Sequence, residues 1–75
     1  MQHDGVREAI ATAVRTEMAR KRRTQRELAE LLHLDQPSVS LRLRGARSFR
    51  AEELSRIADL LGVDVASLMP ASLTS

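Results

Sequence analysis

The sequence predicts an all-α fold, a compact bundle of five short helices over residues 1–70, followed by a frayed tail at 71–75. The chain has 75 residues, which suits one small domain. Its single aromatic residue, Phe49, leaves a core of Leu, Ile, Val, Ala and Met, a composition typical of helices rather than of β-structure. Apolar residues also recur at three- and four-residue steps along most of the chain.

The first helix is expected from about residue 4 to 22, where Val6, Ile10, Val14 and Met18 share one face. The basic run 20–23 closes it with cations where the helix dipole favours them.

The second helix is expected to begin after Thr24, because Thr24 and a glutamate three residues later form a capping-box pattern. Its apolar stripe comprises Leu28, Ala29, Leu31 and Leu32. A corner follows at 33–35, with Leu34 as its apolar plug.

The third helix is expected to open at Asp35 or Gln36, with Pro37 in its first turn, and to end at Gly45. Val39 and Leu43 are its only clear core anchors. A basic loop then occupies 46–50.

The fourth helix is predicted to carry Leu54, Ile57, Ala58 and Leu61 and to stop at Gly62, with Phe49 packed on Leu54. Asp64 is expected to cap a fifth, short helix that Pro70 prevents from continuing.

Composition excludes several classes of function. The chain has no cysteine, so a disulfide framework and a thiolate zinc site are ruled out. His3 and His33 stand without a cluster of metal ligands, and no catalytic set converges, so we expect no cofactor, no metal, no small-molecule ligand and no enzymatic activity. With no signal peptide and apolar runs of only two or three residues, we expect a cytoplasmic protein with no membrane partner.

Charge is segregated along the chain. Residues 20–50 hold nine of the twelve basic residues against three acidic ones, a net charge of +6, while both flanks are acidic. A basic middle is typical of a surface that binds a polyanion, although a solvated charged surface would give the same pattern.

The basic middle coincides with a helix that has little to bury. Gln36, Pro37, Ser40, Leu41 and Arg44 share one face of the third helix, and that face has no acidic residue. The DNA major groove admits and reads such a helix. The sequence therefore predicts binding of double-stranded DNA without catalysis.

Several segments in register resemble the Cro/C1-type (lambda-repressor-like) helix-turn-helix domains, over about residues 6–69. They are Gln25, Ala29, the run 36–40, Gly45 and the Glu53-Leu-x-x-Ile-Ala-x-Leu-Leu-Gly-Val63 segment. The resemblance implies a small bacterial or phage transcriptional regulator, a Cro-like or immunity-type repressor that binds its operator as a homodimer, which could pair only on DNA.

Site residues follow from the residue types together with the resemblance. Base contacts are expected from Gln36, Pro37, Ser38, Ser40 and Leu41. Phosphate contacts are expected from Arg22, Arg23, Thr24, Gln25, Arg26, Arg42, Arg44, Arg47 and Arg50. For Gln36, the two serines and Arg20–Arg23, ordinary helix-end roles remain open. For Arg47 and Arg50 the alternative role is solubility.

Two residues depart from the family pattern. His33 stands where the family usually has Gly, which would be costly if the backbone there has a positive φ. Arg42 replaces a bulky apolar residue and is expected to extend along the domain edge to a phosphate. The alternative function is an antitoxin or anti-activator of the same fold, whose main role is to bind a protein partner.

Overall fold

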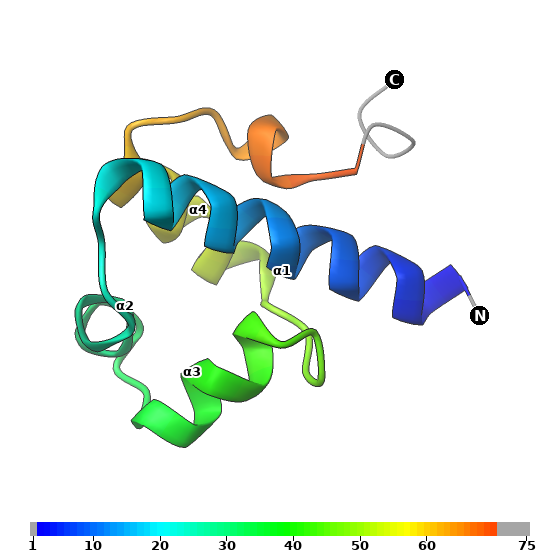
Figure 1. Ribbon diagram of the computed structural model, residues 1–75, viewed down its shortest axis with the longest axis horizontal. Coiled ribbons are helices and arrows are strands. Elements are labelled where there is room, and N and C mark those ends of the chain that lie inside the picture. The colour runs from blue at the N-terminus through cyan, green and yellow to red at the C-terminus, as the bar shows by residue number, and fades with distance from the viewer. Residues whose placement is uncertain (1, 71–75) are drawn as a thin grey trace.

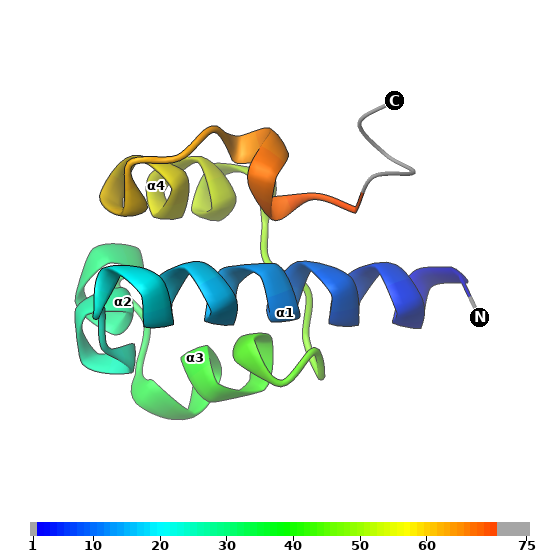
Figure 2. The same ribbon diagram turned by 45° about the horizontal axis from the view of Figure 1, so that its top comes forward.

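The first helix, α1 (Gln2–Lys21), is the central element of the fold. The computed structural model describes the backbone of residues 2–70 and the side chains of residues 5–70. In Figure 2, α1 runs between α3 (Gln36–Leu43) on one side and α4 (Ala51–Leu61) on the other. The second helix, α2 (Gln25–Leu32), lies at the end of α1 where that helix finishes, and it packs against both α3 and α4 (Figure 1).

The predicted fifth helix is corrected by the structure. Residues Val65–Leu68 form a single 3₁₀ turn, η1, so the described chain has four α-helices and one 3₁₀ helix. Asp64 occupies the N-cap position, but its side chain makes no capping hydrogen bond. A four-residue segment between Asp64 and an extended Met69 is too short for an α-helical hydrogen-bond ladder. The all-helical fold class is confirmed, while the tail predicted at 71–75 lies outside the described residues.

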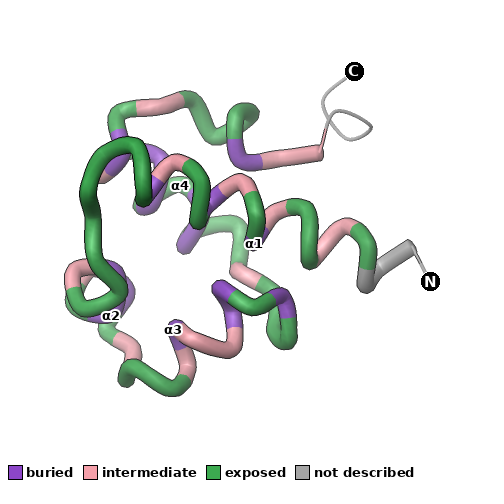
Figure 3. The backbone as a smooth tube through the Cα atoms, viewed as in Figure 1, coloured by how far each residue is buried: buried purple, intermediate pink, exposed green. Residues whose placement is uncertain are grey.

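The five largest fully buried side chains of the core come one from each of the five elements. These side chains are Val14, Leu28, Val39, Ile57 and Leu68. Figure 3 shows buried positions on all five elements, and the predicted apolar stripes of α2, α3 and α4 lie in the core. In α1 the predicted stripe packs in or against the core from Ile10 to Met18, while Val6 is only half-buried. Val39 and Leu43 attach α3 to this core, so the opposite face of α3 is left for solvent or a partner.

Two helices end in a left-handed residue that is not glycine. Arg22 after α1 and His33 after α2 both have φ of 57°. In each case the next backbone N–H reaches back to close the helix, from Arg23 to the Met18 carbonyl and from Leu34 to the Ala29 carbonyl. These tight ends set the sharp turns on both sides of α2.

Candidate nucleic-acid interface

The start of α2 is fixed by the predicted capping box. The Thr24 hydroxyl accepts a hydrogen bond from the Glu27 backbone N–H at 3.2 Å, and the Thr24 N–H donates to the Glu27 carboxylate at 2.8 Å. The backbone hydrogen bond from Thr24, followed by the side-chain bond from Arg23, lowers the pKa of Glu27. Thr24 is therefore already bonded within the protein, which leaves the exposed Gln25 as the freer of these two predicted phosphate contacts.

The corner between α2 and α3 has a positive φ at a residue other than glycine, the costly case considered for this position in the sequence. His33 caps α2 with φ 57° and ψ 43°, and its side chain is exposed. A left-handed conformation costs an L-residue about 1–2 kcal/mol, and short polar residues tolerate it better than β-branched ones. Leu34 next to it is half-buried against the core, as predicted. The corner thus fixes the angle between the two helices despite the lack of glycine.

The first turn of α3 is held by Asp35. Its carboxylate accepts a hydrogen bond from the Ser38 backbone N–H at 2.9 Å. Hydrogen bonds from the Ser38 hydroxyl and then from its backbone N–H lower the pKa of Asp35. The Asp35 carboxylate is thus hydrogen-bonded to the first turn of α3, and α3 itself contains no acidic residue.

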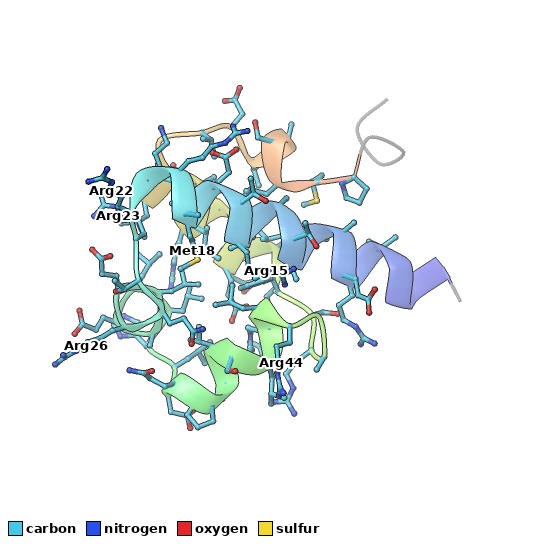
Figure 4. The ribbon with its side chains drawn as sticks, viewed as in Figure 1. Arg15, Met18, Arg22, Arg23, Arg26 and Arg44 are labelled. Carbon is cyan, nitrogen blue, oxygen red and sulfur yellow. The ribbon has the colours of Figure 1, made fainter. Side chains whose placement is uncertain are left out.

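The outer face of α3 presents the residues predicted to contact bases. Gln36 and Pro37 at its N-terminal end are exposed, while Ser38, Ser40 and Leu41 are half-buried. The exposed Arg44 caps the other end, and its side chain points away from the core in Figure 4. The face therefore offers an amide, hydroxyls and apolar groups without a carboxylate, a chemistry that suits the edges of base pairs.

The structure contradicts the expectation that Arg42 reaches a phosphate. Arg42 is 7% exposed and forms an ion pair with Glu53 of α4, with Nε 3.1 Å from Oε1. A further N–H of Arg42 donates to the Ser38 carbonyl at 3.2 Å. Val39, Arg42 and Leu43 follow an i, i+3, i+4 spacing, which puts Arg42 on the inward face of α3. This spacing is visible in the sequence and could have indicated that Arg42 is buried. The partner Glu53 was missed because nothing local in the sequence links it to α3.

The C-terminal end of α3 is anchored on α1. Arg15 donates a hydrogen bond to the Leu43 carbonyl and another, at 3.2 Å, to the Thr12 hydroxyl. Figure 4 shows Arg15 between α1 and α3. Gly45, with φ 77°, packs directly on Glu8. Sequence reasoning missed Arg15, since an arginine on an otherwise solvated face carries no sign that it will cap another helix.

The remaining predicted phosphate contacts are exposed and lie in two groups. Arg22, Arg23 and Arg26 surround the turn between α1 and α2, and Arg44, Arg47 and Arg50 follow α3 (Figure 4 labels four of them). Two members of the first group have acidic partners on α2: Arg23 lies 3.1 Å from Glu27, and Arg26 lies 4.0 Å from Glu30. The structure thus places one group of cations at the turn before α2 and the other directly after α3.

Within the described residues, no three His, Cys, Asp or Glu side chains gather as a metal-binding group. None of the described helices combines the length and apolar character that crossing a membrane requires. His3 lies on α1, but its side chain is outside the described set.

Comparison with known proteins fits this arrangement of α2, the corner and α3. A family model described as helix-turn-helix matches residues 14–68, well over half of the chain. The chain belongs to the helix-turn-helix family. No curated protein matches the sequence of this helix-turn-helix protein.

Two crystal structures of the clp gene regulator ClgR from Corynebacterium glutamicum are similar to this helix-turn-helix protein. Both are 35% identical to it over 83% of its length, with TM-scores of 0.73 and 0.76. The matches cover 80% and 66% of the two ClgR chains. The resemblance to Cro/C1-type domains is confirmed, and family and neighbours together support a DNA-binding transcriptional regulator.

Proposed function

We propose that this protein is a repressor that occupies an operator in double-stranded DNA, with α3 in the major groove. The observation that carries this proposal is the outer face of α3, which is free of acidic residues and is fixed at both of its ends. Asp35 caps the start of the helix, and Arg15 holds its last carbonyl. A helix presented in this way brings defined side chains to base edges rather than a flexible set.

Base readout is assigned to the outer face of α3 between Gln36 and Leu41. Gln36 is the exposed first residue of the helix, and its amide has the donor and acceptor that pair in two-point fashion with adenine N6 and N7. Pro37 and Leu41 offer apolar surface to thymine methyl groups, and the two serines are adaptable.

Phosphate contacts are assigned to the two exposed groups of cations. Arg22, Arg23, Gln25 and Arg26 would face one backbone strand, and Arg44, Arg47 and Arg50 the other. Such contacts set affinity and register but carry no sequence information. Since Arg23 and Arg26 have acidic partners, we expect fewer counterions to be released than the number of arginines suggests.

We further propose that two copies bind one operator. Val65 in η1 is the only large apolar side chain that is classed as exposed among the described residues, at 43% exposure, so the surface around η1 is the best candidate for contact between copies. Pairing only on DNA is consistent with so small an apolar surface.

The experiment is selection of binding sites from a random duplex library at moderate salt, with the purified protein. We expect enrichment of a palindrome whose half-sites lie about one helical turn apart, roughly 34–36 Å. A single ungapped half-site would overturn the two-copy arrangement. No enrichment from a folded protein would overturn operator binding and favour a protein partner.

Two glutamines make a matched pair for the same selection. Gln25 and Gln36 are each the exposed first residue of a helix. Gln36→Ala should relax the preference at one base pair, whereas Gln25→Ala should weaken binding to all sequences alike. If both variants changed the selected sequence equally, the assignment of α3 as the reading helix would be wrong.

A further inference from the structure

A buried ion pair joins α3, the loop that follows it and α4. The Arg42 guanidinium donates to both carboxylate oxygens of Glu53, at 3.1 and 3.5 Å, and also to the Ser38 carbonyl at 3.2 Å. The same Glu53 carboxylate accepts the Arg50 backbone N–H at 2.9 Å. The side chains of the pair are 8% and 10% exposed, so water competes little for these bonds.

The bonds of the pair meet the parts of the molecule that the proposed function uses. Ser38 belongs to the proposed base-reading turn of α3. Arg50 ends the basic loop, whose other end is fixed where the Ala46 and Arg47 N–H groups donate to the Leu41 carbonyl. The pair therefore sets the placement of α3 relative to the loop arginines, although neither of its side chains is exposed enough to contact DNA.

Stability alone does not account for a buried ion pair. Removing two charges from water costs about as much as their attraction returns, and apolar residues of similar volume are often as stable or more so. What apolar residues lack is direction, because a two-point guanidinium–carboxylate contact fixes an angle as well as a distance. In this protein that angle lies between the reading helix and the helix behind it.

We propose that Arg42 and Glu53 are positioning residues for sequence discrimination. They hold α3 and the 44–50 loop in one arrangement, in which side chains at base edges and cations at phosphates are engaged together. The inference rests on the proposed operator binding. It adds two residues to the specificity of the site without assigning either a contact to DNA.

The test replaces the pair by apolar residues, as Arg42→Met/Glu53→Leu. An open pocket of about 320 Å³ beside the pair gives the new side chains room. The matched control is Glu52→Leu/Arg56→Met, which changes the same residue types on exposed positions of the same pocket. Both variants lose the same charges, so they differ in whether the buried pair is removed.

The measurement is the ratio of dissociation constants for the selected duplex and an unrelated duplex of equal length, at one salt concentration, with folding followed by circular dichroism. The pair variant should stay folded and lose about tenfold in this ratio, comparable to one mismatched base pair. Its affinity for the unrelated duplex should change by less than about threefold, because non-specific binding depends on charge more than on register. The control should keep the wild-type ratio.

Conservative single variants keep the test decisive if the double variant does not fold. Glu53→Gln keeps the oxygen that accepts from the Arg42 Nε and from the Arg50 N–H but removes the second acceptor of the two-point contact, and should lose discrimination. Arg42→Lys keeps the charge but lacks the planar fork, and should lose it. A folded Arg42→Lys or double variant with the wild-type ratio would overturn the inference and leave operator binding intact. Absence of discrimination in the wild type would overturn both.

Discussion

Gly45 is the position where a single added carbon should separate two physical effects. Its φ of 77° is left-handed, and a Cβ built there would lie 3.0 Å from the Glu8 Cγ and 3.2 Å from the Glu8 Cα. Gly62 after α4 has nearly the same backbone, with φ 70°, but a Cβ there meets no atom within 4 Å. Gly45→Ala therefore adds strain and a clash with α1, whereas Gly62→Ala adds strain alone.

The magnitudes follow from these geometries. Left-handed alanine costs about 1–2 kcal/mol, and the lower entropy of the unfolded chain returns about 0.4–1 kcal/mol, so Gly62→Ala should destabilise by about 1 kcal/mol. Overpacking against the α1 backbone adds about 1–3 kcal/mol at Gly45, for a total of about 2–4 kcal/mol. A domain of this size has roughly 4–11 kcal/mol of stability, so the Gly45 variant should remain folded but be weakened.

Thermal unfolding followed by circular dichroism measures both variants. One kcal/mol shifts Tm by roughly 4–8 °C in a small domain, so Gly62→Ala should lower Tm by about that amount and Gly45→Ala by at least twice as much. Equal shifts, or a larger one at Gly62, would refute the close packing of the α3–α4 loop on α1.

Three further predictions concern charge. Arg42→Ala, which leaves a buried carboxylate without its partner, should cost about 3–5 kcal/mol in urea unfolding, and a loss below about 1 kcal/mol would contradict a buried pair. Glu30→Gln removes the acidic partner of Arg26, and should tighten DNA binding about twofold with a steeper salt dependence; unchanged binding would mean that Arg26 contacts no phosphate. Hydrogen bonds lower the pKa of Glu27 and Asp35 in the folded state, so the unfolded chain binds more protons at acidic pH. The stability from these two groups is therefore fully present above their ordinary pKa values of 4.5 and 3.8, and it is lost as pH falls through the folded pKa values. Wild type should thus be more stable than a Glu27→Gln/Asp35→Asn variant at neutral pH, and the difference in urea unfolding free energy should shrink as pH falls through the folded values; a difference that does not change with pH would contradict the capping roles.

Local sequence signals predicted most of the helices and their starts. The capping box at Thr24, the opening of the third helix at Asp35 or Gln36 and the stop at Gly62 each depend on residues within one turn, and all three are confirmed. The apolar stripes were equally local, since a helix face repeats every three to four residues. The cost of His33 was also foreseeable, because the corner requires a left-handed residue.

Interactions between distant residues were not predictable in the same way. Arg42 was expected to extend along the domain edge to a phosphate, whereas its burial depends on Glu53, eleven residues further along the chain. The bond from Arg15 to the Leu43 carbonyl spans 28 residues and has no sequence signature. α1 ends in a left-handed residue, Arg22, and no glycine at this position of the sequence indicates such a conformation. The predicted base and phosphate contacts remain predictions, since their exposure is compatible with DNA binding but does not demonstrate it.

The salt dependence of binding to the selected duplex, compared for Gln36→Ala and Arg47→Ala, tests the central claim most directly. We expect Gln36→Ala to lose about 1–3 kcal/mol of discrimination with the wild-type slope of log K against log salt. Arg47→Ala should keep the discrimination and make the slope about 0.9 less negative, as expected for one lost phosphate contact. The same change in both variants, or a wild-type slope near zero, would contradict a reading helix flanked by phosphate-binding arginines.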